Sequence, residues 1–340
     1  MSKSAVAMSG GSLPPTALIL GISPAMERVR SCVERVAVTD VPVLIQGPSG
    51  SGKEVLARWL HAHSPRAQGP FVKVHCPAIP EMLLESELFG HEEGAFTGAV
   101  RAKPGRVEEA EGGTLFLDEI AEMNSALQAK LLHLLQDGEV SRVGGGEPRP
   151  INVRVMCATN HDLEEEMRAG RFRPDLFYRI NVIGLELPPL RQRPQDVMLL
   201  AEYFVQSYSQ RYGRPLAPLS PSTLELLQAY PWPGNVRELE NLMNRYAIFG
   251  SEAVIVNELL GKPAAEAEGA VSLRRVARQA SLDAQRQVIL QVLHAHQWNR
   301  KQTARALKIS YRALLYKLRD TGIPTRRTGR TSARAVPPIQ

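Results

Sequence analysis

A glycine-rich stretch that ends in a lysine, residues 47–54, has the residue types and spacing that bind phosphate. In order, it contains Gly47, Pro48, Ser49, Gly50, Ser51, Gly52, Lys53 and Glu54. Backbone N–H groups of such a loop, with the positive end of the following helix, surround an anionic phosphate, and the lysine reaches the β and γ oxygens. Glu54 stands where a magnesium-binding hydroxyl usually follows the lysine, so we expect Mg²⁺ to be held mainly by another residue and by water. The alternative is a strand-to-helix turn that binds no ligand.

Two adjacent acids, Asp118 and Glu119, follow the apolar run of residues 114–117. Phosphoryl transfer needs a neutralising cation and a positioned nucleophile. We therefore expect Asp118 to join the magnesium shell and Glu119 to polarise the attacking water. A strand that simply enters a helix N-terminus has the same pattern, so the prediction depends on the glycine-rich loop upstream.

Three further polar residues are candidates for the same chemistry. Asn160 ends a later predicted strand, where an amide can sense the γ-phosphate or align the water; an ordinary turn residue is the alternative. Arg173 and Arg179 lie six positions apart in a segment with little other reason to hold them. Either could reach the γ-phosphate of a neighbouring subunit. Surface ion pairing to Asp175 or Glu186 is the alternative for both arginines.

A turn rich in small residues, 94–99, carries one apolar and one hydroxyl side chain at its tip. It consists of Gly94, Ala95, Phe96, Thr97, Gly98 and Ala99. An exposed phenylalanine on a flexible turn is costly unless a partner binds it. The turn is therefore a candidate contact loop, although a hairpin whose Phe96 folds back onto the core would have the same sequence.

Helical and strand patterns alternate around these residues. Apolar runs predict strands over 41–46, 71–76, 114–118, 153–158 and 182–187, and helices over 24–36, 54–63 and 125–138. This alternation predicts an α/β fold, a parallel sheet flanked by helices, with nucleotide at the carboxyl ends of the strands. From residue 189 the pattern is helical, over 196–212, 220–229 and 235–249. The last of these helices places Arg237 one turn from its N-terminus, where it can face nucleotide from a lid.

Length and composition indicate an ordinary globular protein. The 340 residues suffice for two or three domains, and the hydrophobic and charged shares are 44% and 22%. Three cysteines far apart in sequence favour reduced thiols over a disulfide framework. No apolar run is long enough to span a bilayer, and the N-terminus lacks the pattern of a signal peptide. We therefore expect a cytoplasmic protein with no membrane insertion.

Basic charge gathers at the C-terminus. Residues 271–340 contain fifteen Lys or Arg residues and two acids, a net +13, whereas residues 1–270 carry a net −7. Short helices are expected over 302–307 and 310–320, which is helix-turn-helix geometry. The second helix would be capped by its first residue and would offer DNA the residues Ser310, Tyr311, Arg312, Lys317 and Arg319. A three-helix protein-binding bundle and a merely solvated basic surface are the alternatives.

Together these motifs resemble the bacterial enhancer-binding proteins, the AAA+ activators of sigma-54 RNA polymerase. The resemblance covers residues 21–260, with a Fis-like DNA-binding domain at 282–323. Its most specific signature is the 94–99 turn, which in that family is the loop that touches sigma-54. A Lys-Glu ending of the Walker A motif, here 47–54, is usual in the family. The resemblance further implies Walker B at Asp118 and Glu119, sensor one at Asn160, trans-acting arginine fingers at Arg173 and Arg179, and sensor two at Arg237.

Two positions depart from the family pattern. Pro48 stands where the family more often has Glu or another polar residue, and it is expected to stiffen the loop. His75 stands at the strand end where the family typically has an Asn that holds the Walker B glutamate between turnovers. Because histidine can also donate a hydrogen bond, we expect His75 to serve as a switch on Glu119, with sensitivity to pH.

The resemblance implies an AAA+ P-loop core with a helical lid and an all-α helix-turn-helix domain. The expected boundaries are a flexible segment at 1–20, the ATPase subdomain at 21–188, the lid at 189–260, a linker at 261–280, the DNA-binding domain at 281–325 and a disordered basic tail at 326–340. The expected ligands are ATP and Mg²⁺. The expected partners are sigma-54 RNA polymerase and palindromic enhancer DNA.

The implied activity is ATP hydrolysis that remodels the sigma-54 closed promoter complex. The resemblance implies a dimer when inactive and a ring of six or seven subunits when active. The lack of a receiver or ligand-sensing domain leaves two expectations, control in trans by a separate protein or a piece of a longer chain. Two other function classes stay open: a DNA-binding regulator that does not open promoters, and an AAA+ unfoldase or chelatase acting on another protein.

Overall fold

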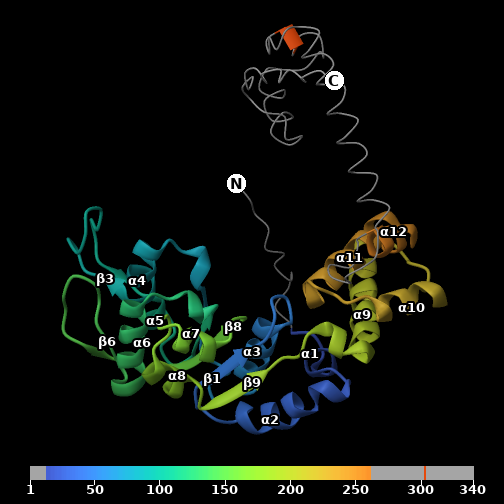
Figure 1. The fold of residues 1–340 in the computed structure, drawn as a ribbon. Coiled ribbons are helices and arrows are strands. Elements are labelled where there is room, and N and C mark those ends of the chain that lie inside the picture. Colours follow the sequence, from blue (N-terminus) through green and yellow to red (C-terminus); the bar gives the residue numbers. More distant parts are fainter. Residues whose placement is uncertain (1–12, 262–301, 304–340) are drawn as a thin grey trace, which may run out of the picture. The chain divides into compact units, whose positions relative to one another are not determined.

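A five-stranded parallel sheet organises the ATPase part of the chain. The computed structural model describes residues 13–261 and 302–303. The strand order is β2-β5-β8-β1-β9 (Figure 1). The strands are β1 (Val43–Gln46), β2 (Phe71–His75), β5 (Thr114–Asp118), β8 (Arg154–Thr159) and β9 (Ile183–Glu186). Parallel strands end at the same edge of a sheet, so Gln46, Asp118 and Thr159 terminate side by side.

Helices cover both faces of this sheet, as the continuous apolar character of its central strands requires. One face packs on α2 (Glu27–Ala37) and α3 (Lys53–Ala62) through residues such as Phe116 and Met156. The other face packs on a larger set through Leu117 and Cys157. That set comprises α4 (Glu81–Phe89), α5 (Arg106–Glu109), α6 (Ser125–Asp137), α7 (Leu163–Arg168) and α8 (Pro174–Ile180). The predicted strands and helices are confirmed to within about two residues at most ends, a shift expected of any boundary.

The N-terminal part of the described chain corrects one expectation. We expected residues 1–20 to be a flexible segment, but Thr16–Leu20 form helix α1. Leu20 is buried, and the Trp59 indole N–H donates to Thr16 Oγ1 at 3.1 Å. The apolar run Leu18-Ile19-Leu20 gives this short helix a face to bury. The average composition of residues 1–20 does not reveal this run. The helix expected from Pro24 begins as a 3₁₀ turn, Pro24–Met26.

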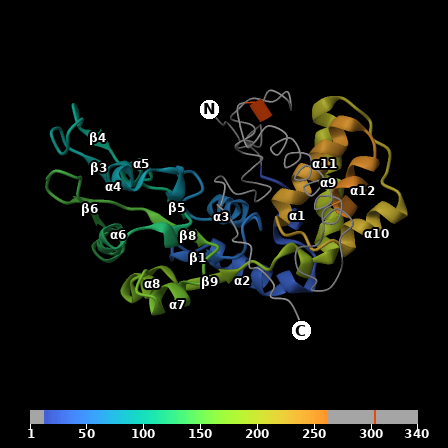
Figure 2. The same ribbon diagram turned by 45° about the horizontal axis from the view of Figure 1, so that its top comes forward.

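Two small hairpins interrupt the α/β alternation and lie side by side in both ribbon views (Figure 1 and Figure 2). The first pairs β3 (Gly90–His91) with β4 (Lys103–Pro104), and the second pairs β6 (Glu139–Val140) with β7 (Arg149–Pro150). We call residues 92–102 loop 1 and residues 141–148 loop 2. His91 forms a bridge with Val143, so the hairpins are joined at their bases.

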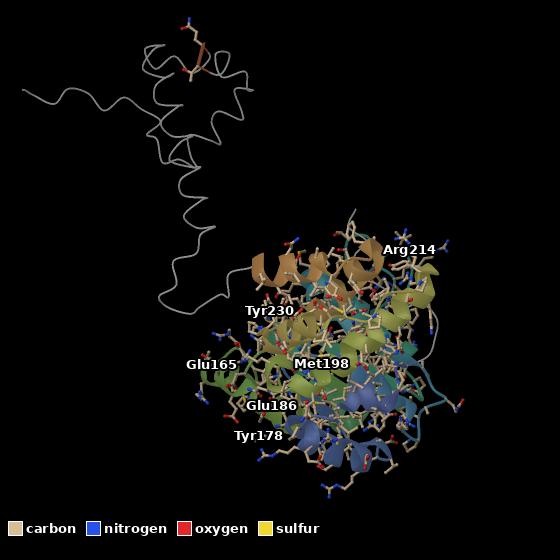
Figure 3. The ribbon with its side chains drawn as sticks, turned by 90° about the vertical axis from the view of Figure 1, so that its right-hand side faces the viewer. Glu165, Tyr178, Glu186, Met198, Arg214 and Tyr230 are labelled. Atoms are coloured by element: carbon tan, nitrogen blue, oxygen red, sulfur yellow. The ribbon has the colours of Figure 1, made fainter. Side chains whose placement is uncertain are left out.

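A four-helix subdomain follows the sheet. It contains α9 (Pro194–Tyr212), α10 (Pro221–Ala229), α11 (Asn235–Phe249) and α12 (Ala253–Gly261). Its core includes Trp232 and Tyr246, both fully buried, while Met198 and Arg214 mark the α9 side of the subdomain (Figure 3). The chain divides into two compact units after Lys262. The predicted DNA-contacting residues, 310–319, lie outside the described residues.

Candidate functional site

The glycine-rich loop has the backbone shape of a phosphate cradle. Gly47, Gly50 and Gly52 have φ values of 153°, 74° and 103°, a region that side chains rarely adopt. At Gly50 a Cβ atom would also lie 2.5 Å from the carbonyl oxygen of Gly234. Lys53 opens α3, and its Nζ donates to the carbonyl oxygen of Gly47 at 2.8 Å. The loop thus holds the lysine ammonium against its own backbone, where the ammonium can meet a phosphate bound by the loop's N–H groups.

Burial and two neighbouring carboxylates act in opposite directions on the charge of Lys53. Its Nζ lies 3.6 Å from Glu119 Oε1. Burial lowers the pKa of Lys53, and the carboxylates of Glu119 and Asp118 oppose that shift. In the same loop, Ser51 Oγ is buried with no hydrogen-bond partner among the described residues. A buried hydroxyl without a partner is costly, so a ligand oxygen at the loop would satisfy it.

Asp118 and Glu119 stand at the carboxyl end of β5, as predicted, but they have different neighbours. Asp118 Oδ2 lies 2.9 Å from His75 Nδ1 across the β2–β5 pair. Glu119 has a φ of 56°, and its Oε2 accepts a hydrogen bond from the backbone N–H of Asn160 at 2.9 Å. In this structure strand register places His75 opposite Asp118, and the positive φ turns Glu119 toward Asn160. A switch role of His75 on Glu119 stays a prediction.

Lys73 is a site residue that the sequence reasoning missed. Its Nζ lies 2.5 Å from Glu54 Oε2 and 3.8 Å from Asp118 Oδ2. Glu54 also accepts from Arg58 Nε at 3.0 Å, so its carboxylate is already paired beside the cradle. The sequence did contain a signal for Lys73. Lys73 and His75 are two residues apart on a strand, so their side chains lie on the same face of the sheet.

Helix α11 of the lid docks on the cradle through its first turn. Asn235 donates from Nδ2 to the carbonyl oxygen of Ser49 at 2.9 Å and accepts at Oδ1 from the Leu190 N–H at 2.9 Å. Arg237 donates its backbone N–H to the Gly50 carbonyl oxygen at 3.4 Å, and its side chain is exposed. The structure thus places Arg237 beside the loop, as predicted. Asn235 was missed because a sequence shows a helix start but not which carbonyl its side chain will reach.

Arg173 and Arg179 are not aimed at the cradle of their own chain. Arg173 precedes α8 and forms a two-pronged pair with Asp175, at 3.0 and 2.7 Å. Arg179 donates to the Leu135 carbonyl oxygen at 3.0 and 2.7 Å, beside a cavity of about 310 Å³ at the amino edge of the sheet. Tyr178, between them, is 73% exposed (Figure 3). The predicted alternative of ion pairing to Asp175 therefore describes Arg173 in this isolated chain.

The 94–99 turn is exposed at its tip. Gly94 N–H donates to the Ala99 carbonyl oxygen at 2.8 Å, which closes the turn. Thr97 is exposed, and the Phe96 side chain is 39% exposed with its ring edge-on to His91 at a centroid distance of 5.0 Å. Phe96 thus folds partly back onto its own hairpin, not into the core, and it leaves an apolar surface in solvent.

An ion-pair network ties the two loops together, and the sequence reasoning missed all of loop 2. Glu108 accepts from Arg142 at 2.9 and 2.7 Å, and Arg142 also reaches Glu92 at 3.2 Å. The Glu92 N–H donates to the Val143 carbonyl oxygen at 3.0 Å. The run Gly144-Gly145-Gly146 was an available signal, because consecutive glycines mark a tight turn.

Two hollows adjoin the cradle. A narrow one of about 90 Å³ lies between α1 and the lid, and its apolar wall includes Leu18, Ile19, Val55, Tyr203, Phe204 and Val236. An open cleft of about 1130 Å³ borders Gly47, Pro48 and Asn160. The first has the apolar lining that a flat heterocyclic base requires, and the second leaves room on the opposite side of the loop.

Comparison with known proteins decides the family. The sigma-54 interaction domain model matches residues 19–186, the AAA+ ATPase lid domain model residues 191–271, and the model of Fis-family bacterial regulatory proteins residues 283–320. The chain is 46% identical over 312 residues to the regulatory protein AtoC of Escherichia coli, covering 90% of this chain and 68% of AtoC. This chain belongs to the family of sigma-54 transcription activators.

Other relatives of this activator agree. The Nif-specific regulatory protein of Azotobacter vinelandii is 44% identical over 313 residues, covering 91% of this chain and 60% of that protein. Crystal structures of NtrX from Brucella abortus, in complex with ADP and with ATP, are 34% identical, cover 89% of this chain and 69% of theirs, and superpose with TM-scores of 0.67.

The expected fold class is confirmed: the activator has an AAA+ parallel-sheet core, a helical lid and a matched Fis-type segment. As an AAA+ P-loop protein it is an ATPase by family. Within residues 13–261 and 302–303, no helix is long and apolar enough to cross a membrane. The three cysteines are free, as expected.

Proposed function

We propose that this activator assembles into a ring, hydrolyses ATP between its subunits and uses the energy to remodel a sigma-54 RNA polymerase closed complex into an open complex. The observation that carries the proposal is the convergence of Lys53, Asp118, Glu119 and Asn160 at one sheet edge while both candidate finger arginines face elsewhere. A nucleotide site that lacks only the cation that stabilises the transition state can receive an arginine from a neighbouring subunit. The cleft beside Pro48 and Asn160 leaves room for that neighbour.

In this proposal the cradle and Lys53 bind the phosphates, Glu119 orients the attacking water, and Asn160 aligns Glu119 through its backbone. The narrow apolar hollow takes the adenine base. Asp118, with water and phosphate oxygens, would hold Mg²⁺, which supplies charge neutralisation on the phosphates. The described residues offer no cluster of three metal-ligating side chains, and a magnesium ion bound largely by substrate and water needs none.

The 94–99 turn is proposed to contact sigma-54, with Phe96 and Thr97 as its tip. An exposed phenylalanine beside a hydroxyl gives an apolar anchor with one directional hydrogen bond. The C-terminal residues Ser310, Tyr311, Arg312, Lys317 and Arg319 are proposed to bind palindromic enhancer DNA, consistent with the net +13 of residues 271–340. We further propose an inactive dimer and a hexameric or heptameric active ring.

Thr97→Ala tests the proposal. It should leave steady-state ATPase activity within about twofold, because Thr97 is exposed and remote from the cradle, yet abolish open-complex formation by sigma-54 polymerase on a supercoiled promoter. Thr97→Ser, which keeps the hydroxyl, is the matched control and should retain most promoter opening. Unchanged transcription by the alanine variant would refute the assignment of the loop, and loss of ATPase activity would refute its separation from the nucleotide site.

A further inference from the structure

One buried amide joins the nucleotide site to the segment that carries Arg173. Gln128 of α6 is fully buried, with 0% of its surface exposed. Its Nε2 donates to the Met123 carbonyl oxygen at 2.7 Å and to the Arg171 carbonyl oxygen at 2.9 Å. Its Oε1 accepts from the Arg173 N–H at 2.8 Å. Both donors and the acceptor of one side chain are therefore used, all on backbone groups.

The two backbone segments that Gln128 joins have separate roles. Met123 follows the single 3₁₀ turn Ile120–Glu122, which begins directly after Glu119. Arg171 and Arg173 lie just before α8, and Arg173 occupies the N-cap position of that helix. A displacement of the chain after Glu119 therefore reaches the backbone of Arg173 through one residue. Among the described residues the Arg173 side chain has only its exposed pair with Asp175, and exposed pairs fix geometry weakly.

A second connection runs parallel to the first. Glu119 accepts from the Asn160 N–H, and the adjacent His161 lies 3.2 Å from Glu122 and 3.5 Å from Glu166. Glu166 in turn pairs with Arg171 at 2.5 Å. These contacts hold the same two segments together from the solvent side, whereas Gln128 holds them from the core. The two segments are thus joined both on the solvent side and in the core. Water cannot replace the buried hydrogen bonds of Gln128.

We propose that Gln128 is a positioning residue that sets where Arg173 is presented to the neighbouring subunit. It rests on the proposed trans-acting role of Arg173. An ordinary core position on α6 would need only a leucine, which would leave the Met123 and Arg171 carbonyls and the Arg173 N–H unpaired. Gln128 satisfies all three and makes the chain after Glu119 and the Arg173 backbone move as one. Each nucleotide site is thereby linked to the arginine that its own subunit offers to the next site.

The test begins with Gln128→Met, which keeps the side-chain length and removes all three hydrogen bonds, and Gln128→Glu, which keeps the acceptor. Both should lower kcat for ATP hydrolysis at least about tenfold, since misplacement of a catalytic group by about 1 Å costs up to about a hundredfold. The KM for ATP should stay within about twofold, because the cradle is untouched. Gln136→Met, an exposed glutamine on the same helix, is the matched control and should leave kcat unchanged.

Mixed rings separate positioning from a general structural role. Glu119→Gln subunits cannot activate water but present a correctly placed Arg173. Mixed with Gln128→Met subunits, they should restore hydrolysis at the intact Glu119 sites of the latter, so the mixture exceeds the sum of its parts several-fold. If either Gln128 variant binds ATP normally but gains nothing from mixing, or if both variants fail to bind ATP, the inference is overturned. The same mixture with Arg173→Ala subunits tests the underlying proposal: failure there refutes the trans role itself, whereas failure only with Gln128 variants refutes this inference alone.

Discussion

Replacing Glu108 with glutamine should loosen the contact between helix α5 and loop 2 by about thirtyfold. The Glu108 and Arg142 side chains are 16% and 14% exposed, and the guanidinium makes two hydrogen bonds to the carboxylate. Exposed ion pairs contribute about 1 kcal/mol or less, and breaking buried ones costs about 3–5 kcal/mol. This largely covered pair lies between these limits, at about 2 kcal/mol, and each 1.4 kcal/mol is about a factor of ten. The glutamine keeps the acceptor for the Gly105 N–H, which Glu108 Oε1 now binds at 3.1 Å.

Amide hydrogen exchange measures this opening directly. The Glu92 N–H donates to the Val143 carbonyl and the Val143 N–H to the Gly90 carbonyl, so both amides exchange when loop 2 moves away from residues 90–92. Glu109→Gln is the matched control: its pair with Arg106 is 41% and 45% exposed, so exchange should rise less than about fivefold. Equal exchange in Glu108→Gln and wild type would refute the claim that this pair holds loop 2 against helix α5.

Two further predictions concern pH and the lid. The hydrogen bond from Arg142 holds the pKa of Glu108 below its ordinary 4.5. The stabilisation by this pair is therefore present above that value and is lost as the pH falls through the lowered pKa. In acid, amide exchange in wild type and in Glu108→Gln should then be alike, and a persistent difference would contradict this assignment. Asn235→Ala should cost about 3 kcal/mol, from two hydrogen bonds at about 1 kcal/mol each and about 1 kcal/mol for alanine at positive φ, and should lower both Tm and ATP affinity. Asn244→Ala, on the same helix with an exposed bond to Tyr212, is the control, and an equal loss of ATP affinity in both variants would show that lid docking through Asn235 is not the cause.

The sheet and the convergence at its edge could be predicted because both follow from local pattern. Apolar runs such as 114–117 need burial on two faces, and parallel strands then bring Asp118 and Asn160 to the same edge. No knowledge of long-range contacts was needed for that step. The loop 94–99 could be predicted for the same reason, because a phenylalanine between glycines and other small residues is a local pattern.

What the sequence could not predict depends on contacts between distant residues. The partner of His75 depends on the register of β2 against β5 and on the positive φ of Glu119, neither of which has a local signal. Asn235 and Gln128 look like ordinary helix residues until the carbonyls they reach are known. Helix α1 is too short to form by propensity alone and exists because it packs on α3.

The backbone at Glu119 carries a lasting cost. A side chain other than glycine at a φ of 56° gives up roughly 1 kcal/mol that a glycine there would recover. Glycine would thus make a more stable fold that lacks the carboxylate proposed to orient the attacking water. The backbone at Glu119 therefore keeps the protein slightly less stable than it could be. A screen of variants for higher stability should select replacements of Glu119, and these would remove its carboxylate.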